Sequence, residues 1–431
     1  MEKGFFQKKF NIDDDKGRYL HWDKLRFLPP PAGLTSEEWW AGIKYARRQM
    51  YKNININDPT GKPFVFLHTD KILRELHWLD QNAFSMIGSI QPIVNSQMKN
   101  TYLIRALIEE AINSSQLEGA STTWRVAKEM LRQKRKPTDK HEQMIYNNYA
   151  AMQFIREYKK EKLTKDLLLE LQRVLTENTL ENKTHSACFR TENEDVKVVN
   201  HRGEVLHVPP AVKYLPKRIE DLCDFANELS SDNFIHPIIK SIILHFLLGF
   251  EHPFVDGNGR MARALFYWHM SQQNYELIEY ISISKIIKKA PVKYGKAYLH
   301  TETDENDLTY FIEHQLDVIK EAVSDLYDYI DKKTKEIEAV NILLSSTRKL
   351  NDKLNYRQLA LIKHAMQHPG FVYTIAEHQN SHGIAYDTAR IDLSQLSDKL
   401  KFLIKEKSGK GFVFRSPRDL IQRINNEVKE N

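Results

Sequence analysis

Apolar residues recur at the spacing of α-helices along most of the chain. Between residues 69 and 85, Ile72, Leu76 and Leu79 lie about one helical turn apart and therefore share one face. Residues 308–344 carry the longest stripe of this kind. The same spacing predicts further helices over residues 36–45, 101–119, 142–158, 164–180, 221–229 and 236–250. The chain is therefore expected to be mainly α-helical.

Two short stretches have the alternating pattern of β-hairpins instead. In the first, about residues 196–209, Val198 and Val205 belong to two β-branched runs on either side of a turn that contains Gly203. In the second, the apolar residues 402–404 and 412–414 flank a polar turn. Each stretch predicts a small two-stranded hairpin.

The length of the chain bears on its domain organisation. At 431 residues it exceeds what one hydrophobic core usually serves, which predicts two or three domains. Residues 1–95 are expected to form an N-terminal helical segment, in which Ser36 caps a helix and residues 53–62 form a loop. A core domain at residues 96–345 and a separate module at residues 351–431 follow.

The C-terminal module has the pattern of a winged helix-turn-helix domain. Helices expected at 358–368, 375–380 and 385–400 precede the second hairpin, and in such domains the third helix enters the DNA major groove. From Asn351 onward, 13 Lys and Arg stand against 9 Asp and Glu, a net charge of +4. The third helix, however, mixes charge signs, which leaves DNA contact and protein docking or a structural role both open. Its charged residues include Asp387, Arg390, Asp392 and Asp398.

Composition narrows the class of protein. Hydrophobic residues make up 41% of the chain and charged residues 28%, so it can bury a core and remain soluble. The net charge of +6 is too small for a general nucleic-acid role to follow from it. Two cysteines, Cys188 and Cys223, make no disulfide framework, and no long apolar run is present. We therefore expect a cytoplasmic protein without membrane contact.

Residues 252–263, with the sequence HPFVDGNGRMAR, combine several chemical signals. Pro253 disfavours helix at the residue before it, so the preceding apolar helix is expected to end at His252. A Gly-Asn-Gly turn at residues 257–259 then leads into a new helix. The free backbone N–H groups at such a helix start, together with the helix dipole, form a site for anions.

The charged residues of this stretch fit polyphosphate chemistry. Arg260 and Arg263 are three residues apart on the new helix, so both can hold oxygens of one polyphosphate. Asp256 supplies a hard oxygen ligand for Mg²⁺, the usual companion of phosphates. His252 can take a proton from an incoming hydroxyl. The set predicts nucleotide-dependent group transfer.

The stretch resembles the signature of Fic-domain proteins, His-x-Phe-x-(Asp or Glu)-Gly-Asn-Gly-Arg-x-x-Arg, at every fixed position. The resemblance implies a helical core that transfers AMP from ATP to a Ser, Thr or Tyr hydroxyl of a protein, which can be the protein itself. It implies that His252 is the base, that Asp256 binds Mg²⁺ and that Arg263 binds the ATP γ-phosphate. The remaining ATP-binding residues would be Gly257, Asn258, Gly259 and Arg260.

A second resemblance lies at the end of the helix expected at 101–119. There Ser114 and Glu118 precede Gly119, in the Ser-x-x-x-Glu-Gly pattern of the Fic inhibitory helix. A carboxylate in the last turn of a helix is disfavoured by the dipole and needs a nearby cation. In the family, this glutamate pairs with the second arginine of the signature, here Arg263, and excludes the γ-phosphate. Taken alone, Glu118 would be an ordinary solvated glutamate.

Three further features acquire a meaning from the resemblance. The hairpin at 196–209 corresponds to a flap that holds the target main chain, with Val205, Leu206 and His207 as target-binding residues. Residues 188–190 resemble the family's Gly-x-(Phe or Tyr)-Arg, with Ala187 in place of glycine. Tyr294 resembles a tyrosine that lies beside the adenine.

Other functions are compatible with the same motifs. The fold could transfer phosphate or remove AMP with the help of Glu118, or the protein could be a DNA-binding regulator whose Fic core senses a nucleotide. The long helix at 308–344 can also support a homodimer. A histidine such as His245, within an apolar helix, is expected to be a packed core residue.

Overall fold

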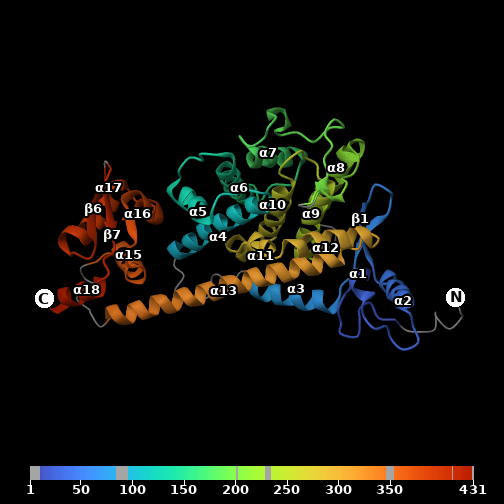
Figure 1. Cartoon of the computed structure of the whole chain (residues 1–431), viewed down its shortest axis with the longest axis horizontal. Helices are drawn as coiled ribbons and strands as arrows, with labels where there is room; N and C mark the ends of the chain where they lie inside the picture. Colours follow the sequence, from blue (N-terminus) through green and yellow to red (C-terminus); the bar gives the residue numbers. More distant parts are fainter. Residues whose placement is uncertain are drawn as a thin grey trace. The chain divides into compact units, whose positions relative to one another are not determined.

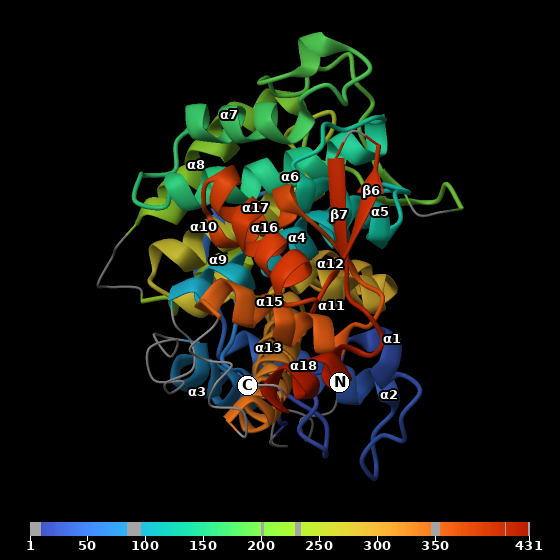
Figure 2. The same ribbon diagram turned by 90° about the vertical axis from the view of Figure 1, so that its left-hand side faces the viewer.

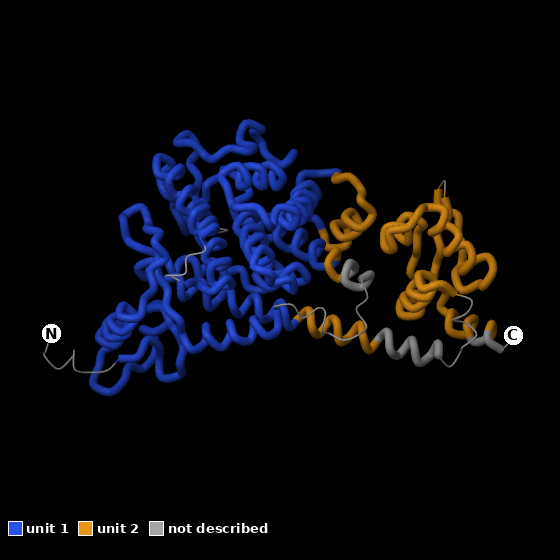
Figure 3. Tube along the Cα trace, turned by 180° about the vertical axis from the view of Figure 1, so that it is seen from behind, with its two compact units in different colours: residues 1–88, 105–122, 138–324 blue, residues 89–104, 123–137, 325–431 orange. Residues whose placement is uncertain are grey.

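The computed structural model describes residues 10–83, 96–199, 202–228, 234–345, 354–409 and 411–429. The chain folds into two compact units, which Figure 3 shows in different colours. The first comprises residues 1–88, 105–122 and 138–324, and the second comprises residues 89–104, 123–137 and 325–431. Helices dominate both units, and within the described residues the strands form three small sheets.

Helices α9 (Pro237–Glu251) and α10 (Asn258–Gln272) pack together within the first unit (Figure 1). Most residues of α9 are apolar and buried, and nearly all of α10 is buried as well. A helix enclosed on all sides in this way belongs to the core. Helices α6 (Lys140–Glu157) and α7 (Lys165–Thr176) pack against α10. The connection between α9 and α10 therefore lies on a rigid support.

Several other elements complete the first unit. They are α8 (Leu215–Asn227), α11 (Ile283–Lys289), α12 (Pro291–Thr303) and short 3-10 helices at Lys183–His185, Val212–Tyr214 and Glu276–Tyr280. Helix α4 (Ser96–Leu117) begins five residues before the predicted helix and ends two residues before its predicted end. The long stripe at the predicted helix 308–344 forms helix α13 (Thr309–Ser345), and its residues Phe311, Leu316 and Val323 are fully buried.

The N-terminal part is less purely helical than predicted. It contains α1 (Trp22–Leu25), α2 (Ser36–Arg48) and α3 (Asp70–Ala83), but also an antiparallel hairpin of β1 (Lys52–Asn57) and β2 (Pro63–Phe66). The prediction of a loop at residues 53–62 is therefore wrong for residues 53–57, which belong to β1. Ile54 and Ile56 alternate with asparagines and are buried. Asparagine disfavours strands, which masked this period-two pattern.

The start of α2 also differs from the prediction. Thr35, not Ser36, is its N-cap: the Thr35 side chain accepts a hydrogen bond from the Glu38 backbone at 3.2 Å. In return, the Glu38 carboxylate accepts from the Thr35 N–H at 2.9 Å. This reciprocal capping box satisfies two helix-end donors, and Ser36 could not form one because Trp39, three residues after it, has no acceptor side chain.

The predicted flap is present as an antiparallel pair, β3 (Val198–Val199) and β4 (Val205–His207). Its turn residues Asn200 and His201 lie outside the described part of the chain. Val199 and Val205 are each more than half exposed. The flap thus presents apolar side chains at the surface.

The second unit contains α5 (Trp124–Gln133) and the C-terminal module. The module runs through α15 (Tyr356–Gln367), β5 (Val372–Thr374), α16 (Ile375–His382), α17 (Tyr386–Ser394), β6 (Ile404–Ser408), β7 (Gly411–Arg415) and α18 (Leu420–Lys429). A turn of π-helix at Gln395–Lys399 continues α17. Figure 2 shows β6 and β7 side by side, and β5 pairs with the other edge of β7.

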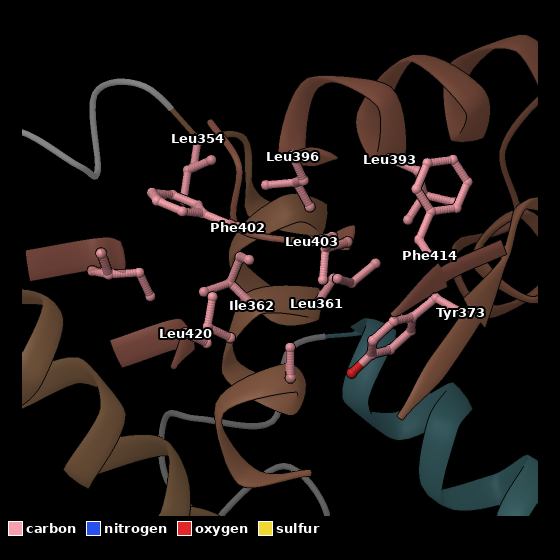
Figure 4. Close-up of a cluster of buried hydrophobic side chains, with 12 residues drawn as sticks. Leu354, Leu361, Ile362, Tyr373, Leu393, Leu396, Phe402, Leu403, Phe414 and Leu420 are labelled. Carbon is pink, nitrogen blue, oxygen red and sulfur yellow. The ribbon is translucent and has the colours of Figure 1, made fainter. Parts of the chain in front are cut away.

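The module has a hydrophobic core of its own (Figure 4). Ile362, Leu393 and Phe402 are fully buried there and come from α15, α17 and the segment before β6. Other members are Leu361, Tyr373, Leu396, Leu403, Phe414 and Leu420. The three helices and the hairpin follow the order of the sequence prediction, to which the structure adds β5 and α18.

Candidate functional site

His252 lies at the C-terminal end of α9, where the chain leaves the helix. Its φ of 45° and ψ of 55° place it in the left-handed region, which a non-glycine residue rarely adopts. The His252 N–H still donates to the Leu248 carbonyl at 3.0 Å, so the residue closes the helix. Pro253, which cannot continue a helix, follows directly.

The loop after His252 is held by two sets of hydrogen bonds. The Asn258 side chain accepts from the Phe254 N–H at 2.9 Å and donates to the Phe254 carbonyl at 2.7 Å. From outside the loop, Arg190 donates through Nε to the His252 carbonyl at 2.9 Å. The Arg190 N–H also donates to the Pro253 carbonyl at 2.9 Å. Side chains far apart in sequence therefore fix the loop backbone.

Helix α10 begins directly after this loop. Gly257, its N-cap, has φ 91°, a conformation that glycine adopts without strain. The first amides of a helix have no acceptors within it. The N–H groups of residues 258 and 259 therefore offer a binding site for an anion, since the Asn258 side chain bonds the loop and not its own backbone.

Arg260 is completely buried beside this helix start. It donates through Nη1 to the Leu175 carbonyl at the end of α7, at 2.8 Å, and through Nη2 to Asp256 at 3.2 Å. Among the described residues, its buried Nε has no hydrogen-bond partner. A buried guanidinium with an unused donor is suited to an anion.

Arg263, one turn further along α10, faces the end of α4. Its Nε donates to the Ser114 hydroxyl at 2.8 Å, and its Nη2 donates to the Ser114 carbonyl at 3.0 Å. The same Nη2 donates to Glu118 Oε1 at 2.8 Å. The ion pair implied by the sequence resemblance is thus present, and Ser114 takes part in it with both its side chain and its backbone.

The Glu118 carboxylate occupies the space in front of the α10 N-terminus. A Cβ added at Gly259 would overlap its oxygen, so glycine at this position allows the close approach. Burial alone would raise the pKa of Glu118, but Arg263, Arg260 and His252 outweigh it and lower that pKa. The glutamate is therefore held ionised where an anion would otherwise bind.

The His252 ring is oriented for proton uptake. Its Nδ1 lies 3.0 Å from the Gly249 carbonyl, which can only accept, so Nδ1 carries the proton and Nε2 is left as a base. Burial lowers the pKa of His252, the bond to Gly249 raises it, His207 lowers it and Glu118 raises it, with a net decrease. The imidazole is therefore neutral at neutral pH.

Asp256 is suited to hold a metal ion by its oxygens. Its side chain is 43% exposed, and Arg260 engages one carboxylate oxygen. An accessible carboxylate beside a phosphate-sized anion site is the usual protein contribution to Mg²⁺ binding, in which waters and phosphate oxygens complete the shell.

Of the other predicted residues, Tyr294 lies in the core beside Arg263, which acts against the effect of burial on the pKa of its hydroxyl. The Tyr294 hydroxyl lies 2.8 Å from His245 Nε2, and both rings belong to the core around Phe311. Burial, Arg263 and His314 lower the pKa of His245, so this histidine stays neutral, as expected for a core residue.

Within the flap, the side chain of His207 points inward. Its Nδ1 lies 2.7 Å from Glu302, and its Nε2 lies 2.7 Å from the Phe250 carbonyl. Val205 is exposed, whereas Leu206 is partly buried. His207 thus anchors β4, and only its backbone remains for a bound peptide.

Two contributions to the site were not assigned from the sequence. One is the loop-holding role of Arg190, although residues 188–190 had been singled out. Phe189 stacks on the buried Phe254 with ring centroids 5.2 Å apart, which directs Arg190 under the loop. Ala187 has φ 53°, which explains why glycine suits that position and implies a cost of about 1 kcal/mol. The other is the Leu175 carbonyl, which leaves no sequence signal.

Comparison with known proteins agrees with this site. Residues 162–270 match the Fic/DOC family. The chain is 45% identical over 60 residues to a "Protein adenylyltransferase Fic" of Nematostella vectensis, and 40% identical over 57 residues to "Protein adenylyltransferase fic-1" of Caenorhabditis elegans. These segments span 14% and 13% of this chain, and 14% and 11% of the two relatives.

A similar fold occurs in a solved structure, that of a Fic family protein from Desulfovibrio desulfuricans G20. The TM-score is 0.51 at 19% sequence identity, over 81% of this chain and 96% of the other. Residues 162–270 are therefore similar to the Fic/DOC family, and the chain has a mainly helical fold like that of the solved structure. In the described part of the chain, no helix combines the length and apolar character needed to cross a membrane.

Proposed function

We propose that the protein transfers AMP from ATP to a Ser, Thr or Tyr hydroxyl of a protein and that Glu118 inhibits this reaction. One observation carries the proposal: the neutral His252 ring, the α10 N-terminus and the arginine pair surround a space that the Glu118 carboxylate now enters. An anion-binding helix start next to a base fits transfer of a phosphate-centred group to a hydroxyl.

In the proposed reaction, the target hydroxyl oxygen attacks the α-phosphorus of ATP. The bond between that oxygen and phosphorus forms as the bond from the α-phosphorus to the bridging oxygen breaks, and pyrophosphate leaves. His252 Nε2 takes the hydroxyl proton. The first amides of α10 and Arg260 stabilise the charge that develops on the phosphate oxygens, and the core behind them keeps their positions fixed.

Asp256 would hold Mg²⁺ with one oxygen while Arg260 engages the carboxylate. When bound, the ion would neutralise charge on the phosphates. The exposed flap edge next to Val205 would pair with an extended segment of the target by strand addition.

Inhibition follows from competition for Arg263. With Glu118 and Ser114 bound to its Nη2 and Nε, Arg263 has few donors left for the γ-phosphate. ATP could then bind only with its phosphates displaced, so that transfer is limited by the fraction of molecules in which Glu118 has moved away.

The test is incubation with ATP labelled at the α-phosphate, alone and with cell lysate, in the presence of Mg²⁺. Glu118→Gly should raise labelling at least about tenfold, because the closed state dominates. Adding Arg263→Ala should abolish this gain, since the arginine also holds the γ-phosphate. Glu109→Gly, within α4, is the control for loosening the helix that leads to Glu118 and should not activate.

The label also separates the alternatives. Label from the α-phosphate with release of pyrophosphate indicates AMP transfer, whereas label from the γ-phosphate indicates phosphotransfer. Loss of AMP from a modified target that depends on Glu118 indicates de-AMPylation. Equal activity of wild type and Glu118→Gly at saturating ATP would overturn the inhibitory role.

A further inference from the structure

Helix α4 contains a buried acidic residue, Glu110, that lies outside the proposed chemistry. Glu110 is only 1% exposed. Its Oε2 accepts from the Tyr267 hydroxyl at 2.9 Å, from the Ser282 hydroxyl at 2.8 Å and from the Ser284 N–H at 3.1 Å. Its Oε1 accepts from the Ser284 hydroxyl. Four hydrogen bonds from neutral donors therefore replace the water that a carboxylate loses on burial.

Glu110 lies on the same side of α4 as the inhibitory residues. Glu110, Ser114 and Glu118 are four residues apart, so they share one face of the helix and its last turn. On α10, Arg263 and Tyr267 are also four residues apart. Glu110 contacts Tyr267, whereas Ser114 and Glu118 contact Arg263. The contact of α4 with α10 therefore has two ends, and Glu110 holds the end away from Glu118.

Helix α11 is held by the same carboxylate. Ser282 and Ser284, at the start of α11, both donate to Glu110. Further along α11, Lys288 donates to the side chain of Gln116, near the end of α4. Glu110 thus joins α4 to two other helices, and α11 contacts α4 at a second point close to Glu118.

The bonds of Glu110 fix a position along the helix axis. Hydrogen bonds are directional and short, whereas apolar packing is not directional and tolerates sliding. A shift of α4 by one residue would move its side chains by about 1.5 Å along the axis. Such a shift would break the bond from Arg263 Nη2 to Glu118, which is 2.8 Å long.

We propose that Glu110 is a positioning residue for inhibition: it fixes α4 against α10 and α11 and so keeps Glu118 within bonding distance of Arg263. This role rests on the proposed function, since it concerns inhibition of the same site. Glu110 also contributes through its charge. Burial lowers the pKa of Arg263, but Glu118 and, to a smaller extent, Glu110 raise it, and the net change is an increase.

The first test measures labelling from ATP labelled at the α-phosphate, with the full-length protein and Mg²⁺. Glu110→Ala should raise labelling at least about threefold, but less than Glu118→Gly does, since Glu118 still reaches Arg263 part of the time. Glu109→Ala is the matched control. Glu109 lies one position earlier in α4, pairs with Arg105 at 2.8 Å, and its replacement should leave labelling unchanged.

A double variant separates positioning from a general structural role. In the Glu118→Gly background, Glu110→Ala should change labelling by less than about twofold, because the contact that Glu110 positions no longer exists. A residue that only stabilises the fold would lower labelling by the same factor in both backgrounds. That result would overturn the proposal.

Ser284→Ala is a milder variant that keeps the test decisive where circular dichroism shows that Glu110→Ala does not fold. It removes the hydroxyl that donates to Glu110 Oε1 and keeps the N–H that donates to Oε2. Labelling should rise, by a smaller factor. Ser241→Ala is its control, because Ser241 is buried but bonds to Pro237 and His269 instead. Unchanged labelling in every folded variant of Glu110 and Ser284 would overturn the proposal.

Hydrogen exchange gives a readout that does not depend on transfer. The N–H groups of Glu118, Gly119 and Ala120 donate to carbonyls of residues 115 and 116, so their exchange reports whether the end of α4 stays in place. Glu110→Ala should speed exchange in residues 114–120 and leave α9 unchanged, and exchange equal to wild type would contradict the role of Glu110. Absence of labelling in Glu118→Gly would instead remove the proposed function, and exchange would still test whether Glu110 positions α4.

Discussion

The start of α10 and the helix α17 each carry several charged residues, but these charged side chains lie in different surroundings. At α10, Arg260 and Arg263 are buried and point toward a common space beside the helix N-terminus. At α17, Asp387 pairs with Arg390 at 3.3 Å on the surface. The first arrangement concentrates positive charge for an anion, and the second neutralises charge locally. Charge count alone therefore does not identify a site.

Several other charges of the C-terminal module are paired as well. Asp392 is buried and accepts from Arg357 and from Asn355, so it stabilises the module and does not lie on an exposed reading face. Asp398 pairs with Lys405 at 3.1 Å, and Glu406 pairs with Arg415 at 2.7 Å. One of the charged residues of the predicted third helix, Asp392, therefore has a structural role.

The largest expected effect is at His252. In the Glu118→Gly background, His252→Ala should reduce AMP transfer by about 10²–10⁴-fold, because a positioned base is lost. ATP affinity should change little, since His252 makes no bond to the anion site. Labelling rates and calorimetry measure the two quantities. A parallel fall in ATP affinity would show that the histidine belongs to the anion site.

The pH dependence gives a smaller effect. Because burial and His207 lower the pKa of His252, the base stays neutral until the pH falls below its ordinary value of about 6.5. Transfer by Glu118→Gly should be constant from about pH 7 to 8 and fall about tenfold per unit below the midpoint. Removing Glu118 takes away a charge that raises this pKa, so the midpoint should move further down. A midpoint above 7 in initial-rate measurements contradicts the assignment.

The smallest expected effect concerns DNA. Since Asp387 offsets Arg390 on α17 and Asp398 offsets Lys405 at the wing, the full-length protein should show little binding to duplex DNA at low salt, with a slope of log affinity against log salt close to zero. Asp387→Lys would release Arg390 and add a charge, and should create salt-sensitive binding. Steep salt dependence in the wild type would instead support the DNA-contact interpretation. Helix α17 would then offer positive charge to an anion, as the start of α10 does.

Much of the fold followed from local pattern. The stripe at the predicted helix 308–344 forms α13, since a long amphipathic helix needs only its own sequence and one apolar partner. The hairpin at β1 was missed because asparagines alternate with Ile54 and Ile56, and their burial depends on a core that only the folded chain supplies.

The candidate site divides in the same way. The sequence by itself determined the start of α10, its glycines and the residue types for an anion, a metal and a base, because all lie within twelve consecutive residues. Apart from the Glu118–Arg263 pair, which the family resemblance implied, the tertiary structure decided what surrounds them. Arg190 reaches the loop from 62 positions away, and Ser114 reaches Arg263 across 149 positions. His300 likewise reaches Asp23 across 277 positions. Packing of distant helices, which local spacing does not encode, brings these groups within bonding distance.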